Sequence, residues 1–142
     1  MKIGLVTPYI YPTPGGVNEH VDHLYRNLRL RGHDVRIISA SHGFQRSTEG
    51  DIIRLGKGFS VPANGSMGTL TLSPRYASQV RRTIAEEHFD LLHFHEPFVP
   101  FLSPLLLRES RSVNVATFHA YGGFSPAYEL GSRFLDGYAR RL

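Results

Sequence analysis

Short apolar runs alternate along this chain with amphipathic stretches, a pattern typical of a β/α protein. Residues 2–7 (KIGLVT) predict a short buried strand, which we expect Pro8 to end. Over residues 17–31, apolar positions recur every three or four residues. That spacing predicts a helix, and Gly32 is well suited to end it. Residues 34–39 alternate and predict a second strand, so the chain opens with a strand–helix–strand unit whose strands are parallel.

The rest of the chain continues this alternation. We expect four more strands, at residues 52–55, 68–72, 89–95 and 113–118. We expect three more helices, at residues 74–87, 98–109 and 126–141. Glycines and Pro62 predict that the remainder of residues 40–66 is loop. The order predicts an α/β fold with a doubly wound, mostly parallel, Rossmann-like sheet. Such a sheet usually has a further strand or two, so we expect residues 1–142 to be one domain of a longer protein.

Composition narrows the class of protein. The chain has 142 residues, 41% of them hydrophobic and 20% charged, which is typical of one globular domain. No apolar run reaches the ~18–20 residues of a membrane span, and the run Ile3–Val6 is too short for a secretory signal, so we expect a cytoplasmic location. The absence of cysteine excludes disulfides and thiolate chemistry. A net charge of +4 is modest, and we expect no nucleic-acid partner.

The turn between the first strand and the first helix contains Gly15 and Gly16, which suggests a nucleotide site. Backbone amides at a helix N-terminus bind anions, and glycine allows a phosphate or a sugar to approach closely. The dinucleotide fingerprint GxGxxG is not met, because Val17 and Asn18 follow. The second strand ends in Ser39-Ala40 and offers no acid for a ribose. Two interpretations therefore stay open, an anion-binding turn and a plain tight turn.

Two histidines, His93 and His95, lie on one predicted strand and share a face because they are two residues apart. A structural role, a place in the lining of a cleft and metal ligation are all compatible with this spacing. A metal site needs further ligands, so we expect none. We expect the following Glu96-Pro97 pair to cap the next helix rather than to act as a general base.

Six segments together resemble family 4 retaining glycosyltransferases, and most closely the phosphatidylinositol mannosyltransferases among them. They are KIGLVTPY, PTPGGV, GHDV, PANGS, FDLLHFHEP and VATFHA. The resemblance covers essentially the whole chain. It implies the N-terminal, acceptor-binding domain of a GT-B fold, whose C-terminal donor-binding domain is absent from these residues. It also implies that a nucleotide-sugar such as GDP-mannose is the donor, that the anomeric configuration is retained, and that no metal or other cofactor is used. By itself this half would be inactive.

The resemblance also implies roles at the donor side of the site. Gly15 and Gly16 would lie against the donor diphosphate, where helix amides stabilise the charge that develops on the leaving group. His119 would contact the transferred sugar and serve as the catalytic residue. It follows the predicted strand 113–118 and therefore lies at the carboxyl edge of the sheet, where ligands of open α/β sheets bind.

On the acceptor side, the resemblance implies that Tyr9 lies against the acceptor's polyol ring and that Asn64 and Ser66 bind its hydroxyl or phosphate groups. A turn without any ligand is equally compatible with Asn64-Gly65. The chain lacks the acidic residue that the family has in the first turn and the arginine that follows its asparagine–glycine–serine loop. The acceptor therefore stays open between phosphatidylinositol, another lipid and a soluble polyol.

The helix predicted at residues 74–87 contains three arginines, Arg75, Arg81 and Arg82. They suit either a peripheral contact with an anionic membrane, at the inner face of the plasma membrane, or a solvated helix face. A function of another class stays open as well, namely a stand-alone, non-catalytic module that binds a polyol phosphate or a nucleotide.

Overall fold

The computed structural model describes residues 1–43, 46–57, 59–63, 66–70, 74–99, 102–119 and 137–142. The strands of its main sheet, in chain order, are β1 (Lys2–Ile10), β2 (Asp34–Ser41), β3 (Ser47–Glu49), β4 (Ile52–Lys57), β7 (Leu91–His95) and β8 (Val113–Thr117). A separate antiparallel ribbon consists of β5 (Phe59–Ala63) and β6 (Ser66–Leu70). The helices are α1 (Gly16–Leu30), α2 (Pro74–Glu87) and α3 (Leu102–Glu109). None of the helices in these ranges is long and apolar enough to cross a bilayer.

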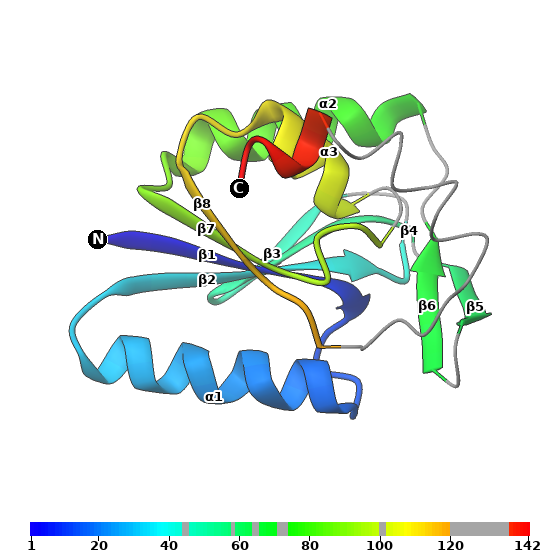
Figure 1. Ribbon diagram of the computed structural model, residues 1–142, viewed down its shortest axis with the longest axis horizontal. Coiled ribbons are helices and arrows are strands. Elements are labelled where there is room, and N and C mark those ends of the chain that lie inside the picture. Colours follow the sequence, from blue (N-terminus) through cyan, green and yellow to red (C-terminus); the bar gives the residue numbers. More distant parts are fainter. Residues whose placement is uncertain (44–45, 58, 64–65, 71–73, 100–101, 120–136) are drawn as a thin grey trace.

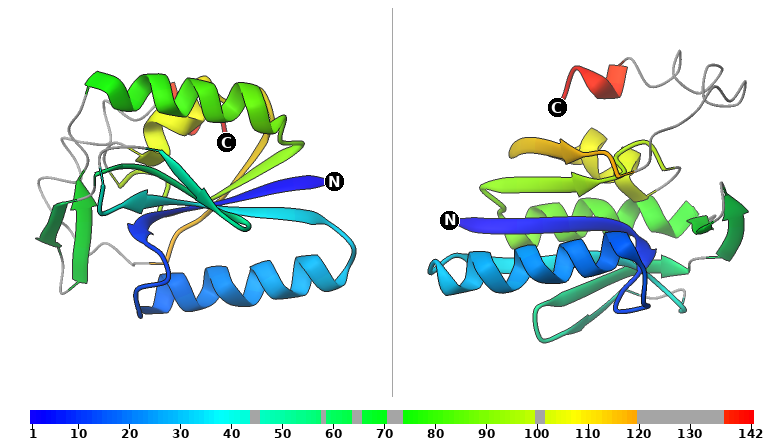
Figure 2. Two further views of the ribbon diagram at one scale, coloured as in Figure 1. Left: turned by 180° about the vertical axis from the view of Figure 1, so that it is seen from behind. Right: turned by 60° about the horizontal axis from the view of Figure 1, so that its bottom comes forward.

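The main sheet has the strand order β3-β4-β2-β1-β7-β8. All neighbours pair in parallel except β3, which runs antiparallel along the edge of β4. Helix α1 covers one face of this sheet, and α2 and α3 cover the other (Figure 1 and Figure 2). The predicted doubly wound, Rossmann-like fold is therefore confirmed.

Side chains alternate between the two faces of the sheet along each strand, so each face has its own buried core. On the α1 face, Leu5 packs in a buried cluster with Val21 of the helix. On the opposite face, Val6 and Phe94 pack in a second cluster with residues of α2 and α3. Gly4 also lies on this second face, where an added Cβ would come within 2.6 Å of the Leu92 side chain. The central strands are thus buried on both faces, as parallel strands usually are.

Helix α1 ends as its sequence predicts. Gly32 has a φ of 83°, in the left-handed region that glycine adopts without strain. The His33 amide donates to the Leu28 carbonyl at 3.2 Å, which closes the last turn in the manner of a Schellman motif. The chain then enters β2 after a short connection, and this fixes the parallel register of β1 and β2.

Two strand predictions are wrong in detail. Pro8 does not end β1, which continues to Ile10. The pairing of β1 with β2 shifts register between Val6 and Ile10. At this irregularity the sheet requires no N–H from residue 8, so proline is tolerated there. The part of residues 40–66 expected as loop contains β3 and β5. Pro62 is compatible with β5 because a two-stranded ribbon leaves each strand with an edge on which no N–H is required.

The predicted helices also differ at their boundaries. Helix α3 begins at Leu102, four residues later than expected, and Glu96 is therefore too far away to cap it. Most of the helix expected at 126–141 lies outside the described residues; the part at 137–139 is helical. The sequence also suggests Ser73 as the N-cap of α2, and this residue lies outside the described residues too.

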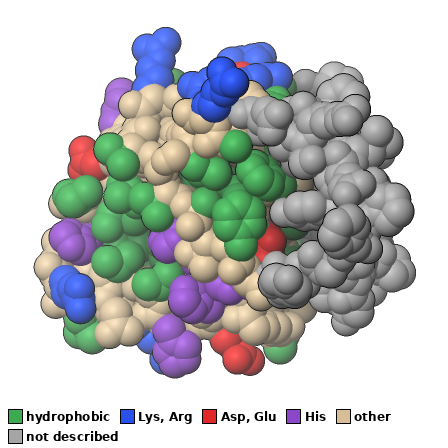
Figure 3. Space-filling view, viewed as in Figure 1, with side chains coloured by type: hydrophobic (Ala, Val, Ile, Leu, Met, Phe, Trp, Pro, Cys, Tyr) green, Lys and Arg blue, Asp and Glu red, His purple; other side chains and the backbone are tan. Residues whose placement is uncertain are grey.

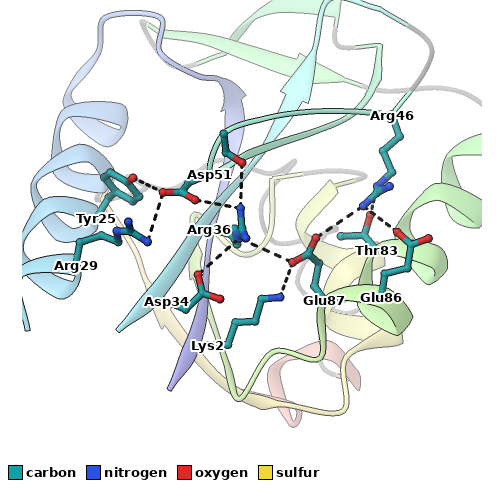
Figure 4. A network of polar contacts seen from close by, with 11 residues as sticks. Lys2, Tyr25, Arg29, Asp34, Arg36, Arg46, Asp51, Thr83, Glu86 and Glu87 are labelled. Atoms are coloured by element: carbon teal, nitrogen blue, oxygen red, sulfur yellow. Dashed lines mark hydrogen bonds and ion pairs between the residues drawn. The ribbon is translucent and has the colours of Figure 1, made fainter. Parts of the chain in front are cut away.

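A network of ion pairs links the elements at the edge of the sheet where β1, β2 and β4 begin (Figure 4). Arg36 of β2 contacts Asp51 at 3.0 Å and Asp34 at 3.7 Å. Glu87, at the end of α2, pairs with Lys2 at 2.8 Å and lies 4.0 Å from Arg36. The network therefore joins the α2 layer to the starts of the central strands, at the edge opposite the one where the strands end.

Candidate functional site

The turn between β1 and α1 is held at the carboxyl edge of the sheet by one buried asparagine. The Asn18 amide donates to the carbonyls of Ile10, at 3.0 Å, and Thr13, at 2.8 Å. Its side-chain oxygen accepts a hydrogen bond from the Thr7 hydroxyl at 2.9 Å. Because Thr7 belongs to β1 and Asn18 to the first turn of α1, these bonds fix the start of the helix against the end of the strand.

The start of α1 is open. No side chain caps this end of the helix, and Gly15 has an extended backbone. A Cβ added at Gly15 or at Gly16 would meet no atom within 4 Å. The protein's own packing therefore does not require glycine at either position, and both glycines are exposed. A helix N-terminus of this kind favours negative charge.

Four imidazoles gather beside this helix end. The rings of His93 and His95 stack with centroids 4.5 Å apart, and those of His95 and His119 stack at 5.2 Å. His20, on the exposed side of the first turns of α1, meets His95 and His119 edge-on, at 5.4 Å and 5.0 Å. Figure 3 shows histidine side chains gathered on this face, beside a band of hydrophobic side chains. The cluster thus joins α1, β7 and the segment after β8.

Hydrogen bonds orient these rings. Nδ1 of His95 lies 2.9 Å from Nε2 of His119, and Nε2 of His93 lies 2.7 Å from the Thr117 hydroxyl. The His119 amide donates to the Glu96 carboxylate at 2.5 Å, and the Glu96 amide donates to the Thr117 carbonyl at 2.9 Å. Glu96 therefore ties the end of β7 to the end of β8, with its own backbone in the left-handed region at a φ of 52°.

Burial favours the neutral form of three of these imidazoles, those of His93, His95 and His119. Burial first, and the neighbouring histidines second, lower the pKa of the fully buried His95 from 6.5 to about 3. Burial is also the main cause of the lowered pKa values of His93 and His119, and proximity to His20 adds to both. Neutral imidazoles both donate and accept hydrogen bonds, so these rings are suited to sugar hydroxyls and to metal ions.

The structure brings several of the predicted site residues to one edge. Gly15 and Gly16 open α1, Tyr9 lies near the end of β1, and His119 follows β8. The ribbon strand β6 contacts β1, so the segment that begins at Ser66 also reaches this end of the sheet. Asn64 lies outside the described residues, as does the side chain of Ser66.

The arginines predicted to meet a membrane lie on α2. Arg81 and Arg82 are exposed, and each has an acidic neighbour, Glu109 at 4.0 Å and Glu86 at 2.6 Å. The side chain of Arg75 is outside the described residues. A membrane contact through these arginines stays a prediction.

Sequence reasoning missed three contributors to the site. His20 comes four residues after Gly16, which places it one helical turn further along the same face of α1, and this spacing was the available signal. In the sequence, Asn18 stands out only as a departure from the dinucleotide fingerprint. Glu96 was expected to cap a helix, and only the pairing of β7 with β8 brings its carboxylate to His119.

Comparison with known proteins places the chain. The sequence profile of Glycosyltransferase Family 4 matches residues 14–142. The chain belongs to glycosyltransferase family 4. The resemblance drawn from the sequence motifs is thus confirmed.

Relatives within glycosyltransferase family 4 include phosphatidyl-myo-inositol mannosyltransferases. The protein of that name from Mycobacterium leprae is 40% identical over 119 residues, which cover 84% of this chain and 32% of the relative. That from Propionibacterium freudenreichii is 32% identical over 148 residues, which cover 100% of this chain and 39% of the relative. This family 4 chain therefore spans about a third of the length of the curated relatives it matches.

The fold is shared with a solved structure, the sucrose-phosphate synthase of Thermosynechococcus elongatus. The TM-score is 0.60 at 15% identity, and the match covers 96% of this chain and 39% of that one. At this identity the likeness concerns the fold alone. It agrees with the predicted Rossmann-like domain of the GT-B type.

Proposed function

We propose that this chain is the acceptor-side half of a glycosyltransferase that moves a sugar from a nucleotide-sugar to a lipid-linked or polyol acceptor of the phosphatidylinositol class. The observation that carries the proposal is the open start of α1 at Gly15 and Gly16 beside the imidazole of His119. The mannosyltransferases among the family 4 relatives support the choice of sugar and acceptor.

In this proposal, the two features act on different parts of the donor. The α1 amides stabilise negative charge on the departing diphosphate. His119, neutral and hydrogen-bonded to His95, contacts the transferred sugar and holds it for attack by the acceptor hydroxyl. A domain beyond these residues supplies the remaining donor contacts. The anomeric configuration is retained, and neither a metal nor another cofactor takes part. Tyr9, Asn64 and Ser66 line the acceptor side, at the inner surface of the membrane.

The test uses the full-length protein, a panel of nucleotide-sugars led by GDP-mannose, and phosphatidylinositol or free inositol as acceptor. Mass spectrometry identifies the product, and NMR gives its anomeric configuration. We expect His119→Ala to lower kcat by about 10²–10³-fold, the usual loss when one donor of a preorganised site is removed. Its circular dichroism should match that of the wild type.

Two outcomes would count against the proposal. Unchanged turnover by His119→Ala removes the role of this residue. Binding of inositol phosphate without turnover, with every donor of the panel, favours the non-catalytic binding module instead.

A further inference from the structure

Three of the clustered imidazoles bring ring nitrogens from three separate segments close together. One ring nitrogen from each of His20, His95 and His119 lies within 4.8 Å of the other two. The three residues come from α1, from the end of β7 and from the segment after β8. They are therefore held together by the tertiary fold and not by sequence proximity. We propose that His20, His95 and His119 form a binding site for a divalent transition-metal ion of the zinc type.

The distances suit such an ion. Zinc binds imidazole nitrogens at about 2.0–2.1 Å, so two ligands of a tetrahedral site lie about 3.3 Å apart. Nδ1 of His95 and Nε2 of His119 are 2.9 Å apart and need to separate by only about 0.4 Å. Both rings can turn a lone pair to the same ion when each carries its proton on its other nitrogen. His20 is exposed on a helix, so its side chain has room to change rotamer, and one of its ring nitrogens lies within 4.8 Å of those of His95 and His119.

The surroundings complete a metal centre with an open position. His93 stacks on His95, and Glu96 accepts the His119 amide, so two of the three ligands are oriented by neighbouring residues. Three protein ligands leave a fourth position for water, as in zinc sites with three histidines. If His119 contacts the sugar as in the proposed function, an ion bound here excludes the donor. The ion is then an inhibitor and not a cofactor.

The direct test is titration of the metal-free, full-length protein with Zn²⁺ by calorimetry and with Co²⁺ by visible absorption. We expect saturation at about one equivalent, with a Co²⁺ spectrum typical of tetrahedral coordination. His20→Asn should weaken Zn²⁺ binding at least tenfold. The matched control is His88→Asn. It removes an exposed imidazole from the opposite edge of the sheet, at a backbone φ of 49° that asparagine accepts.

Each outcome of the titration either supports the metal site or overturns it. Saturable binding that is weakened in His20→Asn and unchanged in His88→Asn supports the site. Absence of saturation, or equal affinity in wild type and His20→Asn, overturns it. Because the titration needs no turnover, it stands even when the proposed transferase activity fails. In an active enzyme, Zn²⁺ should inhibit competitively with the donor, and unchanged activity at saturating Zn²⁺ would overturn the inhibitory role.

Discussion

At the scale of single residues, the neutral state of His95 has a consequence for stability. Its folded pKa of about 3 lies below its ordinary 6.5, so the folded protein resists its protonation whereas the unfolded chain does not. The stability that this provides is complete above pH 6.5 and is lost as the pH falls towards 3. One imidazole that stays neutral only in the folded state lowers the free energy of unfolding by about 2 kcal/mol between pH 7 and pH 5.

We therefore expect the free energy of unfolding to fall between pH 7 and pH 5, and His95→Gln to flatten this dependence by about 2 kcal/mol. Urea denaturation at the two pH values measures the effect. His33→Gln serves as the control, because His33 lies outside the cluster. Equal pH dependence in wild type and His95→Gln would show that His95 is not the group responsible.

Glu96 presents a second prediction at this scale. Its carboxylate accepts a hydrogen bond from the His119 backbone amide. A hydrogen bond to a charged acceptor is about twice as strong as one between neutral groups. We expect Glu96→Gln, which keeps an acceptor but loses the charge, to lower kcat/KM roughly tenfold, and Glu96→Ala to lower it further. Steady-state kinetics of the full-length enzyme decide this, with Glu49→Gln on exposed β3 as the control. Equal activity of the alanine and glutamine variants would contradict a positioning role.

At the scale of elements, the close approach of β1 and β7 constrains one glycine. A Cβ at Gly4 would meet Leu92 at 2.6 Å and Phe89 at 3.2 Å, and both of these side chains are buried. We expect Gly4→Ala to lower the free energy of unfolding by about 1–3 kcal/mol, the usual cost of overpacking. Gly43→Ala is the control, because its nearest contact would be an ordinary 3.8 Å. Chemical denaturation measures both, and equal midpoints would show that Leu92 relaxes without cost.

The elements also show how far sequence reasoning reaches. Helix α1 and strands β2, β7 and β8 were predictable because their patterns are long or strongly apolar and their boundaries carry clear signals such as Gly32. Strand β5 was not, because Pro62 predicts a loop unless the partner strand is known. The edge that carries the site was predictable, since parallel strands end on the same side of a sheet.

The convergence of individual side chains was not predictable. His20 and Glu96 acquire their roles from contacts across 75 and more positions of the chain and across 23, respectively. The pairing of β7 with β8, and the packing of α1 beside both strand ends, create these contacts. No local pattern specifies these contacts, so the sequence indicates neither the place of His20 nor the contact of Glu96 with His119.

At the scale of the whole molecule, the ion-pair network at the other edge connects both helical layers to the sheet. Asp51 pairs with Arg36 and also receives the Tyr25 hydroxyl of α1 at 2.6 Å, while Glu87 belongs to α2. We expect Arg36→Met to cost about 1–2 kcal/mol, because it leaves partly buried carboxylates with fewer partners. Thermal or urea unfolding tests this.

The matched control is Arg82→Ala, which removes a solvent-exposed pair with Glu86 on one helix. We expect it to leave the unfolding midpoint unchanged, since exposed pairs contribute little. High salt should narrow the difference between wild type and Arg36→Met only slightly, because partly buried pairs are poorly screened. Equal effects of the two substitutions would show that the network is no more than a set of surface pairs.

The NMR signals of histidine ring protons can report on the candidate site, because it contains His20, His93, His95 and His119. These are four of the eight histidines in the chain, and imidazole ring protons resonate apart from most other signals. Half of the histidine spectrum therefore reports on a single small region, and the remaining four residues provide internal references. Any molecule that enters this region should shift the first set and leave the second in place, so ligands can be screened without a label.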